Sequence, residues 1–219
     1  MSKNSYAVLG LGSFGSTLAV ELSKAGHTVL ACDLNASRVD ELRDKVAQVV
    51  IADVSSEETI KELNVGKFDA VILGMSSYLE KQILALTHLK QEGARRILAK
   101  ARTAIQDRIL TRLGADEVIR PEQDLARRLA RRLSFSNITD LIEFKEGAWI
   151  GEVTVPEVLA GKTLKELDLR NRHQVTVLLL RRPGSTVENT PGPDVRLSKD
   201  DQLTVFGKRD SIIELFKER

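Results

Sequence analysis

The sequence has little of what marks secreted, membrane-spanning or metal-binding proteins. Its 219 residues include one cysteine, Cys32, so no intrachain disulfide can form and a reducing cytoplasm is the expected compartment. No apolar run approaches about 20 residues, so we expect no transmembrane helix, and the first residues lack the basic and apolar segments of a signal peptide. The three histidines, at 27, 88 and 173, stand apart from Asp, Glu and Cys clusters, which argues against a histidine-based metal centre.

An excess of charge of one sign is also missing. The chain carries 33 Lys and Arg against 31 Asp and Glu, and a net charge of +2 gives no overall attraction to nucleic acid or membrane. The segment 121–133, "PEQDLARRLARRL", is nevertheless basic and has no aromatic residue. It predicts an amphipathic helix with solvated arginines and an apolar side that packs against another subunit or domain. A nucleic-acid-binding regulator is the weaker interpretation. The arginines are Arg127, Arg128, Arg131 and Arg132, and the apolar side is Leu125, Leu129 and Leu133.

Up to about residue 120 the chain alternates short apolar runs with helical patterns. The runs are rich in Val, Ile and Leu and apolar on both faces, which is typical of strands covered by helices on both sides. Six such strands predict a Rossmann-like, doubly wound parallel α/β sheet. The runs lie at 6–10, 28–33, 48–53, 69–74, 96–101 and 117–120.

The first turn of this pattern carries a glycine motif. Gly10, Gly12 and Gly15 have the spacing G-x-G-x-x-G, follow an apolar strand and open an amphipathic helix. The glycines permit a tight turn, and the helix N-terminus attracts phosphates. Asp33 ends the next strand and is expected to accept hydrogen bonds from ribose hydroxyls, which favours a ribose without a 2′-phosphate. This context favours a nucleotide site over a glycine-rich turn without a ligand.

Two further residues near this corner have open interpretations. Asp53 ends the third run, where its carboxylate would reach the base or ribose, or would cap the following helix in place of Ser55 or Ser56. Cys32 lies inside a strand and is expected to be a small core residue without a redox role.

The remaining residues predict a small α+β unit. Strands are expected at 148–156, 175–182 and 201–207, a short helix begins at "TLKEL", and "RDSIIELFKER" closes the chain as a longer helix. A unit of this size is small for the substrate domain of a dehydrogenase, and no nucleophile motif such as G-x-S-x-G occurs. A non-enzymatic regulator is therefore favoured over the alternative, an NAD-dependent oxidoreductase.

Nearly the whole chain resembles the RCK family, the regulators of potassium conductance. The segments "YAVLGLGSFGSTLAVELSKAGHTVLACD" and "LTRLGADEVIRPEQDLARRLA" are similar to an RCK N-lobe. "GKTLKELDLRNRHQVTVLLLRR", followed by "PGPDVRLSKDDQLTVFG", is similar to its C-lobe. The length matches the cytosolic subunits of Ktr and Trk potassium uptake systems. The expected division is a nucleotide-binding N-lobe with the crossover helix at 1–135 and a C-lobe at 136–219.

The resemblance implies a regulatory role. Such proteins gate a membrane-embedded potassium-translocating subunit, dimerise and form a ring, usually an octamer. They lie in the cytoplasm at the inner face of the membrane. The implied ligand is an adenine nucleotide, ATP or ADP and alternatively NAD(H), which controls the ring conformation. A divalent cation near the ATP phosphates and cyclic di-AMP in the C-lobe are further implied ligands.

The resemblance and the motifs together assign site residues. Ser13 stands where the family usually has an arginine that reaches the terminal phosphate, so we expect weak discrimination between ATP and ADP. Lys100 and Arg102 would supply positive charge from another strand. Glu122 matches the glutamate that helps to hold the cation. Cyclic di-AMP would contact Arg170, with Val175 and Val177 beside its bases. The cofactor-binding candidates are Gly10, Gly12, Ser13, Phe14, Gly15, Asp33, Asp53, Gly74, Lys100 and Arg102.

Overall fold

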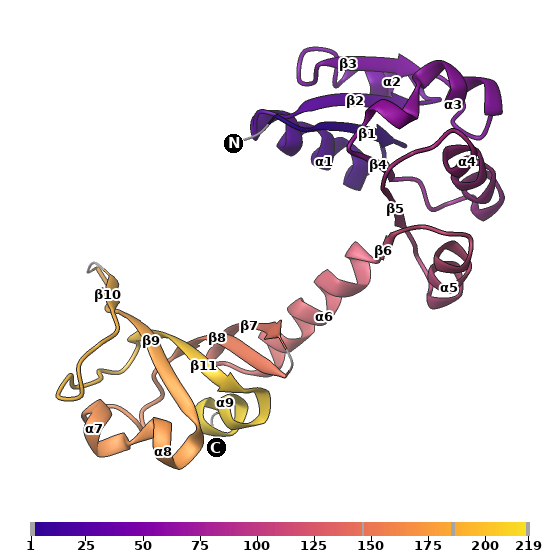
Figure 1. Ribbon diagram of the computed structural model, residues 1–219. Helices are drawn as coiled ribbons and strands as arrows, with labels where there is room; N and C mark the ends of the chain where they lie inside the picture. The colour runs from indigo at the N-terminus through magenta and orange to yellow at the C-terminus, as the bar shows by residue number, and fades with distance from the viewer. Residues whose placement is uncertain (1–2, 146, 185–186, 218–219) are drawn as a thin grey trace. The chain divides into compact units, whose positions relative to one another are not determined.

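The computed structural model describes residues 3–145, 147–184 and 187–217 and forms two compact units, Met1–Gln123 and Asp124–Arg219 (Figure 1). The division falls near the start of helix α6 (Pro121–Ser134), whereas the lobe boundary predicted at residue 135 lies at its other end. Among the described residues, none of the helices combines the length and the apolar character that a membrane span requires.

The first unit is built on a six-stranded sheet in the order β3-β2-β1-β4-β5-β6, with every neighbouring pair parallel. Each of the six apolar runs overlaps one strand, so the predicted sheet is confirmed. The strand order reverses between β1 and β4, and ligands of such sheets bind at the carboxyl ends beside this point. The strands are β1 (Ser5–Leu9), β2 (Thr28–Asp33), β3 (Gln48–Ile51), β4 (Ala70–Leu73), β5 (Ile97–Lys100) and β6 (Glu117–Ile119).

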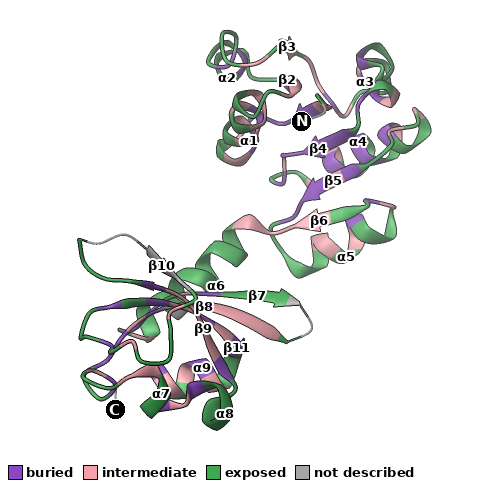
Figure 2. Cartoon of the chain, turned by 60° about the vertical axis from the view of Figure 1, so that its left-hand side comes forward, coloured by how far each residue is buried: buried purple, intermediate pink, exposed green. Residues whose placement is uncertain are grey.

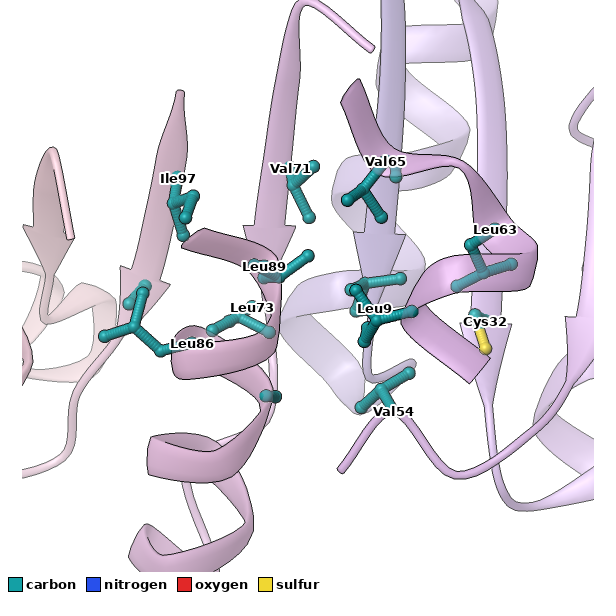
Figure 3. Close-up of a cluster of buried hydrophobic side chains, with 14 of the residues drawn as sticks. Leu9, Cys32, Val54, Leu63, Val65, Val71, Leu73, Leu86, Leu89 and Ile97 are labelled. Carbon is teal, nitrogen blue, oxygen red and sulfur yellow. The ribbon is translucent and has the colours of Figure 1, made fainter. Parts of the chain in front are cut away.

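Helices cover both faces of this sheet. Alternate residues of each strand point to opposite faces, so the strands contribute to two separate core clusters. Leu9 and Leu73 belong to one core cluster, which includes Leu86 of α4, whereas Val8 and Ile72 belong to a second cluster. Figure 3 shows Leu86 and Leu89 of the first cluster on a helix drawn in front of the strands. The helices are α1 (Ser13–Lys24), α2 (Ala36–Asp40), α3 (Glu57–Leu63), the 3₁₀ helix η1 (Val65–Lys67), α4 (Leu79–Gln91) and α5 (Ala104–Arg112).

The prediction that Cys32 is a core residue is confirmed. Its side chain is fully buried in the first cluster, and burial raises the pKa of the thiol to about 12. A thiol with so high a pKa is almost entirely protonated at neutral pH and is a poor nucleophile.

The second unit contains a five-stranded antiparallel sheet in the order β10-β9-β11-β8-β7. The three predicted strands, the short helix and the closing helix are confirmed, whereas β7, β10 and α8 were not predicted. The elements after α6 are β7 (Ile138–Lys145), β8 (Ala148–Thr154), α7 (Leu164–Leu167), α8 (Leu169–His173), β9 (Val175–Arg181), β10 (Val187–Asn189), β11 (Gln202–Lys208) and α9 (Arg209–Phe216).

One core cluster holds this unit together. Ile212 and Phe216 of α9 are fully buried against strand residues such as Val205. On the edge strand β7, in contrast, the side chains of Ile142 and Phe144 are 53% and 70% exposed. Helix α6 is also exposed along most of its length (Figure 2).

Candidate nucleotide-binding site

A cavity of about 720 Å³ opens at the carboxyl ends of the strands that flank the reversal of strand order. Its volume lies within the usual range for small-molecule sites, about 300–1,000 Å³. The first unit alone supplies its lining. The candidates on this lining are Gly10, Gly12, Asp33, Asp53, Gly74 and Lys100.

Three glycines allow the backbone segments around the cavity to pack closely. Gly10 has a φ of +96°, and a Cβ there would lie 2.8 Å from the backbone nitrogen of Met75. A Cβ on Gly15 would lie 2.0 Å from the carbonyl oxygen of Gly10, and one on Gly74 would lie 2.5 Å from the same oxygen. These three glycines are therefore required by the fold itself.

Gly12 is different, because nothing within the chain requires a glycine there. Its φ is −65°, and an added Cβ would meet no atom within 4 Å. The residue lines the cavity and occupies the N-cap of α1, whose first turn has no acidic residue and no side-chain cap. A helix N-terminus without an acidic residue or a side-chain cap suits an anion, and here it begins at the wall of the cavity.

Asp33 ties the glycine turn to the next element. One carboxylate oxygen accepts the N–H of Leu11 at 2.6 Å, and the other accepts the N–H of Asn35 at 2.8 Å. The Arg38 guanidinium lies 3.6 Å from the first oxygen and also lines the cavity. Each oxygen keeps a lone pair for a ribose hydroxyl. Sequence reasoning missed Arg38, although it follows Asp33 on the short helix α2.

Asp53 is held by a different set of partners. One oxygen accepts hydrogen bonds from the N–H and hydroxyl of Ser55, and the other lies 2.8 Å from the Lys81 ammonium. These contacts, that of Lys81 foremost, lower the pKa of Asp53 to about 2. The alternative that Asp53 caps the next helix is wrong, because Ser56 occupies the N-cap of α3. Lys81, which lines the cavity from α4, was not predicted.

Lys100 lines the cavity near the start of α1. Its residue is buried, and its ammonium forms an ion pair with Glu122 and lies 5.7 Å from the ring centroid of Phe14, at the start of α1. The contact with Lys100 lowers the pKa of the Glu122 carboxyl below its ordinary value. Lys100 also lines an adjoining hollow of about 490 Å³ that contains Arg102 and Glu122. The two hollows share Ser76, Ser77 and Lys100.

Gln82 of α4 fixes the strand ends beneath the cavity. Its side chain is fully buried, and its Nε2 donates to the carbonyl oxygens of Met75 and Lys100 at 2.8 and 2.7 Å. The amide therefore joins the residues that follow β4 to the end of β5. A single glutamine in an amphipathic helix gives no local signal for this role, so it was not predicted.

Profiles of two domains match the chain: the TrkA-N domain matches residues 6–121, and the TrkA-C domain matches residues 150–218. The chain belongs to the TrkA-N/TrkA-C family. The cavity lies within the TrkA-N match, and the antiparallel sheet lies largely within the TrkA-C match.

Similar proteins share most of this length. The "Ktr system potassium uptake protein C" of Bacillus subtilis is 32% identical, over 94% of this chain and 92% of its own. The "Ktr system potassium uptake protein A" of Vibrio alginolyticus is 33% identical, over 97% and 96%. The solved "GsuK Channel" is 20% identical with a TM-score of 0.67, over 99% of this chain but 40% of its own, and shows a shared fold. The chain thus spans less than half of that structure.

The TrkA-N domain offers no metal site made of side chains alone. Among the residues that the structure describes, no group of three His, Cys, Asp or Glu side chains could hold a metal ion. Glu122, the candidate metal ligand, is engaged with Lys100. A cation beside Glu122 would need further ligands of another kind, and the phosphates of a bound nucleotide are one source of them.

The cyclic di-AMP candidates lie in the TrkA-C domain. Arg170 is exposed on α8, and Val177 is half-buried on β9. Val175, in contrast, is fully buried in the core cluster, so within one chain it does not reach a binding surface. The cyclic di-AMP site stays a prediction, and Val175 is its weakest member.

Proposed function

We propose that this protein is a non-enzymatic, nucleotide-binding regulatory subunit of a membrane potassium-uptake system. The observation that carries the proposal is Gly12, a glycine that the fold does not need, at a helix N-terminus that faces a cavity. The names of the similar Ktr proteins supply the potassium-uptake context. Mass spectrometry of the small molecule that stays bound after purification tests the nucleotide. Potassium uptake by cells that carry the protein with its transporter, or lack it, tests the role.

The proposed ligand is an adenine nucleotide. Asp33 supports a ribose site, and the N-terminus of α1 supports a phosphate site beyond it. Two solved structures with a similar fold are titled "GsuK channel bound to NAD" and "Crystal structure of the GsuK bound to ADP". ATP, ADP and NADH should therefore all be titrated, and an absence of binding for all three contradicts the proposal.

The charges in the cavity support weak discrimination between ATP and ADP. Each cation on its lining faces a carboxylate: Arg38 faces Asp33, Lys81 faces Asp53, and Lys100 faces Glu122. With Ser13 in the glycine turn, no arginine of that turn reaches a terminal phosphate. A third phosphate group therefore gains little from charge-assisted bonds.

An oxidoreductase is the competing function, and it makes a distinct prediction. Such an enzyme turns over a nicotinamide cofactor, whereas a regulator binds NADH without oxidising it. NADH absorbance, followed with the purified protein and a panel of small carbonyl substrates, separates the two. We expect binding without turnover, and no salt-dependent affinity for DNA.

The regulatory subunit is proposed to dimerise, with its dimers forming an octameric ring beneath a membrane-embedded potassium-translocating subunit. Its expected location is therefore the cytoplasm at the inner face of the membrane. The apolar side of α6 supports an assembly, because Leu125, Leu129 and Leu133 are 67%, 42% and 77% exposed. Large exposed apolar patches mark interaction sites. Co-purification with the translocating subunit, followed by mass measurement of the complex, tests the partner and the ring size.

Cyclic di-AMP is proposed as a second ligand, held between two TrkA-C domains. Arg170 is exposed and free to contact a phosphate. A symmetric ligand suits a two-fold axis, so calorimetry should give one ligand for two chains. Binding should be lost in Arg170→Ala and kept in the matched variant Lys165→Ala. An absence of heat and of thermal shift in the wild type contradicts this site.

A further inference from the structure

Glu122 and a nucleotide phosphate would bind the same ammonium. The Lys100 side chain is 11% exposed and lies between the cavity and the adjoining hollow. Its ammonium lies 5.7 Å from the ring centroid of Phe14, in the first turn of α1, and a helix N-terminus favours an anion. The same ammonium contacts the Glu122 carboxylate.

These two acceptors compete for one ammonium and repel each other. A phosphate at the start of α1 and the Glu122 carboxylate are both negative, and both lie within reach of one buried cation. A partly buried site has a lower effective dielectric constant than water, so the repulsion between them is only partly screened. Without Lys100 as its partner, the Glu122 carboxylate can be hydrated, because its side chain is 65% exposed.

We propose that Glu122 acts as an intramolecular competitor: it pairs with Lys100 in the empty site and lowers the affinity of the site for nucleotide phosphate. The proposal rests on the proposed function, because it concerns the same cavity. Glu122 lies in the first turn of α6, so phosphate binding acts directly on the start of that helix. The carboxylates that line the cavity itself, Asp33 and Asp53, are each held by hydrogen bonds from nearby N–H or hydroxyl groups, and their side chains are less exposed than that of Glu122.

The test is calorimetric titration of ADP in buffer with EDTA, so that no divalent cation links Glu122 to the phosphates. Glu122→Gln should bind ADP about five- to tenfold more tightly than the wild type, because the amide holds Lys100 less strongly and does not repel the phosphate. Glu117→Gln is the matched control. Glu117 pairs with Arg96 on an exposed surface and lines neither hollow, so the affinity of this variant for ADP should equal that of the wild type.

A double-mutant cycle shows that the effect passes through Lys100. Lys100→Met should weaken ADP binding, and Glu122→Gln should tighten binding less in this background than in the wild type, because only the direct repulsion of the phosphate is then relieved. Equal or weaker binding of ADP by Glu122→Gln in EDTA overturns the proposal, whatever the fold of the Lys100 variant. Full tightening that persists without Lys100 also overturns it. Wild-type protein that binds none of ADP, ATP and NADH overturns the proposed function as well, which separates the two failures.

A second titration of the same variants with excess Mg²⁺ measures the predicted cation role. If Glu122 helps to hold a cation, Mg²⁺ should tighten ADP binding by the wild type and reduce the advantage of Glu122→Gln. If Glu122 is a competitor alone, the advantage should stay about five- to tenfold. Mg²⁺-dependent tightening that is equal in both proteins would show that the cation binds the nucleotide without Glu122.

Discussion

The two units of the chain differ in how completely each buries its own apolar surface. The first unit covers both faces of its parallel sheet with separate core clusters and leaves a polar cavity at the strand ends. The second has one cluster and leaves Ile142, Phe144 and the leucines of α6 exposed. We therefore propose that the first unit binds a ligand in its polar cavity and that the second contacts another protein surface through its exposed apolar residues.

The largest effect should come from a glycine that the fold of the first unit requires. Gly15→Ala places a Cβ 2.0 Å from the Gly10 carbonyl oxygen, so the helix and the turn must separate. We expect the free energy of unfolding to fall by at least about 3 kcal/mol. Gly12→Ala is the control and should change it by less than about 1 kcal/mol. Urea denaturation compares the two, and equal effects would contradict the packing described for Gly15.

The next effect separates ligand binding from folding. Gly12→Val directs a branched side chain into the open space of the cavity, so binding of ADP or NADH should fall at least about 100-fold, or about 2.7 kcal/mol. The melting temperature should change little. Gly192→Val, at a glycine that is equally open but outside the cavity, should bind as the wild type does. Wild-type affinity for ADP and NADH in a folded Gly12→Val variant would contradict the assignment of the binding site to this cavity.

The apolar surface beside the second unit gives a third test. Leu125→Glu and Leu133→Glu should weaken self-association by about 1–2 kcal/mol each, because each removes a large exposed leucine from the proposed interface. Light scattering over a range of concentrations measures the change. Arg132→Glu, an exposed residue of the same helix, is the control. Unchanged assembly in both leucine variants would place the interface elsewhere.

A smaller effect concerns the missing charge in the glycine turn. The wild type should bind ATP and ADP within about threefold of each other, and Ser13→Arg should raise the preference for ATP about tenfold. Thr17→Arg, one turn further along α1, should not. Calorimetry with both nucleotides measures the ratios. A strong ATP preference in the wild type would show that Lys100, Arg102 or a partner subunit replaces the arginine.

The smallest effect depends on pH. The folded pKa of Asp53, about 2, lies below its ordinary value of 3.8, so its contribution to stability is full above about pH 4 and is lost as the pH falls towards 2. The side chain is 36% exposed, which limits the contribution to about 1 kcal/mol at neutral pH. Asp53→Asn should therefore be less stable than the wild type at pH 7, with a smaller difference at pH 3. Denaturation at both values checks this, and a difference that grows at pH 3 contradicts the ion pair.

The sequence predicted the sheet of the first unit because its signals are local. Apolar runs mark the strands, and the spacing of Gly10, Gly12 and Gly15 marks the turn between β1 and α1. It did not predict that Lys81 would pair with Asp53, or Gln82 with two strand ends, because these contacts join residues far apart in the chain. Only the folded sheet brings them to one edge.

The second unit was harder to predict for a different reason. Strand β7, "ITDLIEFK", mixes charged residues with exposed apolar ones, because it lies at the edge of the sheet. The three residues of β10 and the five of α8 are too short for a periodic pattern. Val175 was assigned to a ligand pocket because a strand pattern does not show which of its faces is buried.

The open side of Gly12 has a consequence for how this sequence would change over time. Substitutions at Gly10, Gly15 and Gly74 disturb the fold, so selection for a stable protein is enough to remove them. A substitution at Gly12 disturbs only what binds in the cavity. If the cavity holds the proposed nucleotide, Gly12 would be the first of the four to drift in a descendant that no longer used that ligand, while the other three stayed glycine. The residue at this position therefore reports whether a lineage still depends on its ligand.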